Sequence, residues 1–197
     1  MYFDIEGNYI GGTLPSSIGS LSSLLELDVD YNDITGTLPP SLGSCLELTN
    51  FDVAKNLFTG VLPSSIGSLT ALTFIDMDSC AFSGQLPASL GSLTDLYEFE
   101  AYRNAISGTI PPSFGSMISL TVLELDENEL SGSIPPSLGS LADVYELEFE
   151  QNRLTGYIPS SFGSLEEVDK LDLEQNLVRW SLFMSGLFLF VLMFNFR

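Results

Sequence analysis

The chain has 197 residues, enough for one domain with a core, and its 26 Asp and Glu against 6 Lys and Arg give a net charge of −20. This balance excludes nucleic acid as an expected partner, because phosphate binding needs a basic patch. There is no His, so the commonest general base and metal ligand is missing. We therefore expect a protein that is not an enzyme and has no cofactor.

A 24-residue repeat runs through the chain without insertion or deletion from Phe3 to Val178. Apolar residues recur at this period, at Phe3, Leu27, Phe51, Ile75, Phe99, Leu123, Leu147 and Leu171. An Asn follows five residues later in every unit except one, where Cys80 takes its place, and columns of Gly and Pro come after the Asn. One short unit cannot bury its own apolar face, so the units must stack into a solenoid.

Within one unit the elements follow in a fixed order, as in "LTVLELDENELSGSIPPSLGSL", residues 120–141. Alternation around Leu123 and Leu125 predicts a short strand whose apolar side chains enter the core. Asn128 is expected to turn the chain and to bond backbone groups of adjacent coils through a buried amide. The segment "PPSLGSL" is too short for a long helix, which favours 3₁₀-like turns.

The consensus L-x-x-L-x-L-x-x-N-x-L-x-G-x-I/L-P resembles the leucine-rich repeat family, in its plant-type 24-residue form, found in receptor-like kinases and receptor-like proteins. The resemblance covers about nine tenths of the chain. It implies an α/β-type right-handed solenoid over residues 1–178, with about eight strands and a truncated first repeat. A parallel sheet is expected on the concave face, and short 3₁₀ or irregular turns on the convex face.

Acidic residues follow the same period on the exposed side of the predicted strands. The first acidic column, one residue after each core position, is Asp4, Asp28, Asp52, Asp76, Glu100, Glu124, Glu148 and Asp172. The second acidic column, two residues further on, is Glu6, Asp30, Asp78, Asp126, Glu150 and Glu174, with Ala54 and Tyr102 as interruptions. Glu26, Glu98 and Glu146 add a third, so that 17 of the 26 carboxylates are expected on the concave face. Adjacent strands lie about 4.8 Å apart, so we expect these charges to repel, to attract cations and to raise some of their own pKa values.

Three interpretations of these columns remain open. The face is simply solvated and keeps a repetitive chain soluble, or it binds a basic protein or peptide by electrostatic attraction into the concavity. In the third interpretation it binds Ca²⁺ or a polyamine weakly, as a structural or cell-surface protein would. We take non-catalytic, receptor-like binding of a basic protein or peptide as the main hypothesis.

Aromatic residues beside the carboxylates favour recognition of a cation through their ring faces, or else they cover the sheet backbone by cross-strand packing. Lys55 and Arg103 lie on the rim of the same face, where they are expected to pair with neighbouring acids. No metal site is assigned. The candidate ligand-binding residues are Asp28, Asp30, Asp52, Phe74, Asp76, Asp78, Tyr97, Glu100, Tyr102, Glu124, Asp126, Tyr145, Glu148, Glu150, Asp172 and Glu174.

The two ends of the chain point to different compartments. Residues 179–197 form a hydrophobic segment in which "WSLFMSGLFLFVLMFNF", residues 180–196, has no charge and would be about 26 Å long as a helix, the short end of a membrane span. This predicts a membrane anchor with the solenoid outside the cell, or else a hydrophobic cap or a gene-model artefact. The lack of a signal peptide, of capping Cys pairs and of N-x-S/T sites favours instead an intracellular soluble product or a truncated gene model.

Cys45 and Cys80 replace core residues in different parts of the repeat and are expected to be buried thiols.

Overall fold

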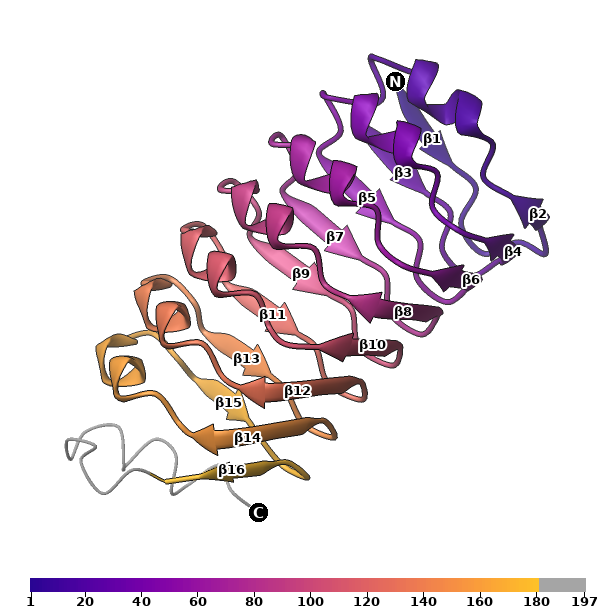
Figure 1. The fold of residues 1–197 in the computed structure, drawn as a ribbon. Coiled ribbons are helices and arrows are strands. Elements are labelled where there is room, and N and C mark those ends of the chain that lie inside the picture. The colour runs from indigo at the N-terminus through magenta and orange to yellow at the C-terminus, as the bar shows by residue number, and fades with distance from the viewer. Residues whose placement is uncertain (181–197) are drawn as a thin grey trace.

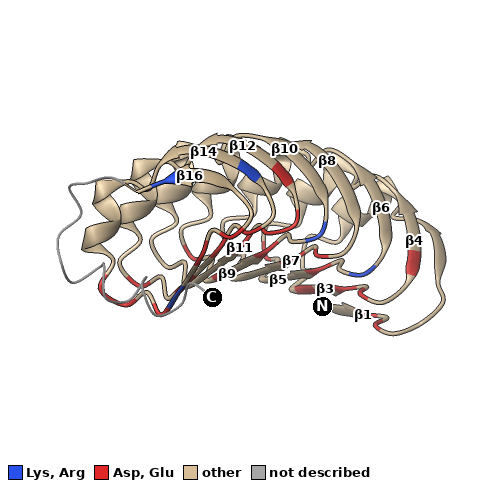
Figure 2. Cartoon of the chain, turned by 90° about the horizontal axis from the view of Figure 1, so that it is seen from below, with Lys and Arg blue, Asp and Glu red and all other residues tan. Residues whose placement is uncertain are grey.

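The computed structural model describes residues 1–180, which form a curved solenoid of stacked coils (Figure 1). One full coil has three sides, formed by a strand of a first parallel sheet, a strand of a second parallel sheet and a short 3₁₀ helix. The arc seen in Figure 2 carries the first sheet on its inner side. The expected solenoid with a concave parallel sheet is therefore confirmed.

The first sheet contains eight parallel strands in sequence order, each paired with its equivalent one repeat away. The pairing keeps the 24-residue register throughout, for example Leu123 opposite Phe99 and Leu147. Its strands are β1 Tyr2–Asp4, β3 Glu26–Asp28, β5 Asn50–Asp52, β7 Phe74–Asp76, β9 Glu98–Glu100, β11 Val122–Glu124, β13 Glu146–Glu148 and β15 Lys170–Asp172.

A second parallel sheet of eight strands lies on another side of the coil, and the sequence did not predict it. Its segments are short, and each strand of this second sheet except β16 contains a Gly with positive φ, such as Gly84 at 73°. The apolar alternation that indicates a strand is therefore missing. Its strands are β2 Gly11–Thr13, β4 Asp33–Gly36, β6 Leu57–Gly60, β8 Ala81–Gln85, β10 Ala105–Gly108, β12 Glu129–Ser133, β14 Arg153–Tyr157 and β16 Leu177–Arg179.

Short 3₁₀ helices connect the second sheet back to the first, as the "PPSLGSL" segments predicted. A Pro in extended conformation precedes each helix, such as Pro87 with φ −69°, and one apolar residue per helix is buried. Their bounds are η1 Ser16–Ser20, η2 Pro40–Ser44, η3 Ser64–Ser68, η4 Ala88–Ser92, η5 Pro112–Ser116, η6 Pro136–Ser140 and η7 Ser160–Ser164.

The core is one continuous apolar column that runs along the inside of the solenoid. Each coil contributes side chains from all three sides, as Phe99 of β9, Ile106 of β10 and Phe114 of η5 show by their nearly complete burial. Burial of this kind contributes roughly 1.5–3 kcal/mol for each large apolar side chain. Because neighbouring coils share the column, the stability of one coil depends on the next.

Buried Asn side chains bond consecutive coils together, as the sequence predicted. Asn128 is 9% exposed, and its Nδ2 donates to the carbonyl oxygens of Ala101, Leu125 and Asp126 at 2.9–3.2 Å. Its Oδ1 accepts the N–H of Ile106 at 2.9 Å. One amide therefore satisfies four backbone groups of two coils, and the bond to Ile106 ties it to β10 of the second sheet.

Cys80 interrupts this arrangement in the fourth coil. Its Sγ lies 3.5 Å from the carbonyl oxygen of Val53, and burial raises its thiol pKa to about 11. A thiol is a weak donor and makes fewer hydrogen bonds than an amide. Both Cys are free, Cys45 buried as expected and Cys80 only half-buried.

Replacing Cys80 by Asn should raise the free energy of unfolding by about 1 kcal/mol, because the new amide can form the bonds seen at Asn128. Urea unfolding followed by circular dichroism measures this change. The reverse change in an intact coil, Asn128→Cys, is the control and should destabilise the protein by about 2 kcal/mol or more. A Cys80→Asn variant less stable than the parent chain would show that the fourth coil cannot accommodate the amide.

The predicted membrane anchor, residues 180–196, falls outside the described residues apart from Trp180. Within residues 1–180, no helix has both the length and the apolar character needed to cross a membrane.

Candidate ligand-binding surface

Each strand of the concave sheet ends at a residue of the first acidic column. Figure 2 shows acidic residues gathered along this sheet. Strand pairing places these residues directly opposite one another, so that Asp76 pairs with Asp52 and with Glu100. Parallel neighbours of this kind are about 4.8 Å apart. The predicted continuous row of carboxyl groups, from Asp4 to Asp172, is therefore confirmed.

These carboxylates are less exposed than a solvated face requires, since Asp76 is only 8% exposed and most of the others are half-buried. Burial and then repulsion from neighbouring acids raise the pKa of Asp52 to about 7 and that of Asp76 to about 8. For Glu100, burial, a hydrogen bond with Glu98 and further acids raise the pKa to about 9. The centre of the row is thus partly protonated at neutral pH in the absence of a cation.

The second acidic column is exposed only in part, whereas the sequence predicted an exposed row. Asp30 and Asp126 are each 8% exposed, and Asp78 is fully buried. The next residue in each coil has positive φ, as Tyr31 does at 48°, so the chain turns sharply here and neighbouring coils cover the preceding side chain. The prediction of exposure was therefore wrong for Asp30, Asp78 and Asp126, whereas Glu6 and Glu174 are exposed as predicted and Glu150 is half-buried.

Asp78 has a counter-ion from the preceding coil. Lys55 Nζ lies 3.4 Å from Asp78 Oδ1 and 4.6 Å from the ring centroid of Tyr31. Tyr102 lies on the other side of Asp78, and burial together with this carboxylate raises the pKa of the Tyr102 hydroxyl. This cluster forms a partly neutral section of the concave face, and the predicted pairing of Lys55 with an acid is confirmed.

Arg103 also pairs with an acid, as predicted. Its Nε lies 2.9 Å from Glu127 Oε1 at the rim, and its guanidinium lies 5.9 Å from the Tyr102 ring centroid. The Arg103–Glu127 pair is largely exposed, so its contribution to stability is small.

A third cation that pairs with acids of the concave face, Lys170, was not predicted from the sequence. Lys170 Nζ lies 3.0 Å from Glu146 Oε1 and also contacts Glu148 Oε1. Burial lowers the pKa of Lys170, but the two glutamates outweigh this effect and raise it. The signal was present, because Lys170 stands one period after Glu146 in the third column, directly opposite it in the sheet.

Two exposed tyrosines flank the row in its C-terminal half. Tyr97 and Tyr145 are each 45% exposed and occupy equivalent places two repeats apart, just before β9 and β13. Between them lie Glu98, Glu100 and Glu124. Phe74 and Tyr102 are only half-buried. The structure therefore brings predicted aromatic and acidic residues together around β9, β11 and β13.

Several groups of three carboxylates have oxygen atoms within 4.8 Å of one another. Two of these groups include an acid already paired with a cation, Lys170 in one and Arg103 in the other. The other two have no ion pair with Lys or Arg in the part of the chain that the structure describes. They are Asp4–Glu6–Asp28 and Glu150–Asp172–Glu174.

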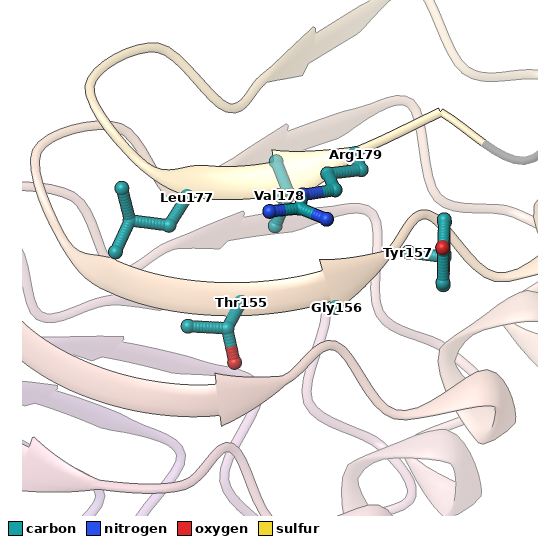
Figure 3. A pocket seen from close by; sticks show the side chains of 6 residues that line it. All are labelled: Thr155, Gly156, Tyr157, Leu177, Val178 and Arg179. Atoms are coloured by element: carbon teal, nitrogen blue, oxygen red, sulfur yellow. The ribbon is translucent and has the colours of Figure 1, made fainter.

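A hollow of about 420 Å³ lies elsewhere, on the second sheet between β14 and β16. Figure 3 shows its lining residues spread along the two strands, with Arg179 as the only charged side chain among them. The hollow has no group of convergent polar side chains, so we do not assign it a binding role.

Stacked coils with one parallel strand each on a concave face define a repeat solenoid of the binding-scaffold type. The family model "Leucine Rich Repeat" matches residues 1–21, 23–45, 71–93, 119–141 and 144–165. The chain belongs to the leucine-rich repeat family, in its plant-type form.

Similar solved structures include plant receptors. A TDR receptor is 34% identical with a TM-score of 0.88, over 90% of this chain and 31% of the receptor chain. The Arabidopsis receptor kinase HAESA, in complex with the peptide hormone IDA and the co-receptor SERK1, is 28% identical with a TM-score of 0.87, over 90% and 30%. The PEPR1–AtPEP1 structure is 32% identical with a TM-score of 0.86, over 91% and 25%.

This chain therefore spans about a third or less of the length of these receptors. A search of curated protein sequences gives no match.

Proposed function

We propose that the chain is the ligand-binding part of a receptor-like protein and that its acidic concave face binds a basic protein segment or peptide. The observation that carries the proposal is the in-register row of carboxylates in the first acidic column. Most of its central members have no ion pair with a basic side chain of the described residues. A ligand with Lys or Arg side chains would supply the missing charge.

The surface around β9, β11 and β13 is the proposed centre of this site. A Lys or Arg side chain of the ligand can contact Glu100 and Glu124 while its aliphatic part lies against Tyr97 or Tyr145. An extended peptide suits a row whose groups recur about every 4.8 Å. The role is binding rather than catalysis, in keeping with the receptors described above, two of which were solved with a peptide hormone or with AtPEP1.

We further propose that the solenoid lies outside the cell, as in a receptor ectodomain, and that residues 180–196 attach it to the membrane. The proposed function differs from general protein binding because its ligand is basic. If the concave face were merely solvated, no saturable binding of a basic peptide would be expected.

The triple variant Asp76→Asn, Glu100→Gln, Glu124→Gln should bind an octalysine peptide at least about 30-fold more weakly than the parent chain, a loss of about 2 kcal/mol. Isothermal titration calorimetry of the full chain at low salt measures this. The triple variant should also be more thermally stable, because it removes repulsion, so unfolding cannot explain the loss. Binding by the parent chain should weaken steeply with salt and strengthen from pH 6 to pH 9, as Asp76 and Glu100 ionise.

A control triple variant removes the same charge from exposed positions outside the three columns: Asp95→Asn, Asp143→Asn and Glu167→Gln. The affinity of this control for octalysine should stay within about twofold of that of the parent chain, because only the net charge of the protein changes. Equal weakening by both triple variants, or no saturable binding by the parent chain, would refute the proposed site.

A further inference from the structure

We propose that Glu98 and Glu100 of β9 form a subsite for one primary ammonium group, as carried by a lysine side chain of the ligand. This inference rests on the proposed function, and it specifies which cation the concave face binds and where. The equivalent pair of glutamates on β13 is closed to the ligand, because Lys170 of the chain itself occupies it.

The contacts of Lys170 show how such a pair holds an ammonium group. Lys170 Nζ lies 3.0 Å from Glu146 Oε1 and also contacts Glu148 Oε1. The two glutamates are separated by one residue of β13, so both side chains are on the same face of the strand. Lys170 comes from the next strand, β15, where it is directly opposite Glu146. The chain therefore already contains one ammonium group held between two glutamates of the concave face.

The glutamate pair on β9 has the same spacing but no cation. Glu98 and Glu100 are the equivalents, two repeats earlier, of the pair that holds Lys170. The residue opposite Glu98 on the following strand, in the place that corresponds to Lys170, is Val122. Within residues 1–180, neither glutamate of the β9 pair forms an ion pair with Lys or Arg. A lysine of the ligand can supply the ammonium group that this coil lacks.

Apolar residues border the β9 pair on both sides. In the sheet, Glu98 is opposite Phe74 of β7 and Val122 of β11. Phe74 is half-buried, and Val122 is 4% exposed. The methylene groups of a lysine side chain can pack against such residues while its ammonium group contacts the carboxylates. Apolar surroundings also strengthen the attraction between the opposite charges.

Without a cation, the two carboxyl groups of the β9 pair are hydrogen-bonded to each other. Burial, this hydrogen bond and the charges of Asp76 on β7 and Glu124 on β11 raise the pKa of Glu100 to about 9. Two carboxyl groups in contact do not both ionise unless a positive charge lies beside them. An ammonium group between them would supply that charge in place of the proton.

Calorimetric titration of the full chain with octalysine at low salt tests the subsite. Glu98→Gln should weaken binding about fivefold or more, because it removes one of the two carboxylates. The matched control Glu146→Gln removes the same charge from the pair that Lys170 already occupies, and should change the Kd by less than about twofold. Octaarginine is the comparison ligand. Glu98→Gln should weaken its binding less, because a guanidinium is a planar fork of donors rather than a compact charge.

Lys170→Gln tests the inference in the opposite direction. This change opens the pair Glu146 and Glu148 to the ligand, so octalysine should bind about fivefold more tightly. Arg153→Gln is the charge-matched control, since Arg153 belongs to β14 of the second sheet and pairs with Glu129. Its affinity for octalysine should stay within about twofold of that of the parent chain.

Three results would overturn the inference: unchanged octalysine affinity in Glu98→Gln, equal weakening in Glu146→Gln, or no gain in Lys170→Gln over the Arg153→Gln control. If the triple variant described above still bound octalysine weakly, the proposed function would stand without this subsite. Equal weakening of octalysine and octaarginine by Glu98→Gln would overturn the assignment to an ammonium group. No saturable octalysine binding by the parent chain would overturn the inference and the proposed function together.

Discussion

Raising the pH from about 5 to about 9 should make the folded protein less stable, in contrast to most globular proteins. The carboxyl groups at the centre of the row have folded-state pKa values of about 7 for Asp52, Glu124 and Glu148, about 8 for Asp76 and about 9 for Glu100. In the unfolded chain they ionise near pH 4. Between these values the folded state holds more protons than the unfolded state, so the free energy of unfolding falls as pH rises.

The size of this effect is limited by solvent screening and by the mutual coupling of the acids. After discounting for both, we expect a total loss of about 4 kcal/mol, or about 10 °C in Tm for a chain of this size. Thermal unfolding followed by circular dichroism at pH 5, 7 and 9 measures it. Added salt should restore part of the loss at pH 9, because it screens repulsion between neighbouring coils.

A matched variant isolates the cause. Asp76→Asn with Glu100→Gln should flatten the pH profile, and should raise the Tm at pH 9 more than at pH 5. The double variant Asp95→Asn with Asp143→Asn, at exposed positions, should follow the parent profile. A parent chain whose stability rises from pH 5 to pH 8 would show that the row is well solvated and unperturbed.

Substitution of Gly91 by Ala should destabilise the protein by about 3–4 kcal/mol, although it adds only one methyl group. Gly91 lies in η4, where coils stack closely, and a Cβ atom there would lie 2.3 Å from the carbonyl oxygen of Ser113 and 2.6 Å from its Cβ. These atoms cannot move away easily, because Ser113 belongs to η5 and its Oγ donates to the carbonyl oxygen of Ala88 at 2.7 Å. Relief therefore requires separation of two coils.

Urea unfolding should show this loss as a lower midpoint. Because each coil contacts mainly its neighbours, separation at one interface should also reduce the cooperativity of unfolding. Gly11→Ala is the control, since the nearest atom to its Cβ would be the Asp33 carbonyl oxygen at an ordinary 3.7 Å. That variant should stay within about 0.5 kcal/mol of the parent chain, and an equal loss at both positions would contradict the stacking explanation.

The 24-residue period by itself determined the stacking of the coils, the strands of the concave sheet, the buried Asn bonds and the register of the first acidic column. All of these follow from one rule: equivalent residues of successive coils lie side by side when the repeat has constant length. Leu123, Asn128 and Glu124 could therefore be placed from their columns alone. The pairing of Lys55 and Arg103 with acids followed in the same way, because few cations face many carboxylates.

Only the tertiary structure decided what happens where the chain leaves the strand and turns. There the left-handed residue redirects the backbone, so Asp30, Asp78 and Asp126 are buried rather than exposed. The second sheet also depends on contacts between coils, such as the bond from Ile106 to Asn128, which no local alternation reveals. Which carboxylates have a counter-ion and which do not was likewise set by the reach of side chains across coils, because a repeat pattern gives columns but not distances.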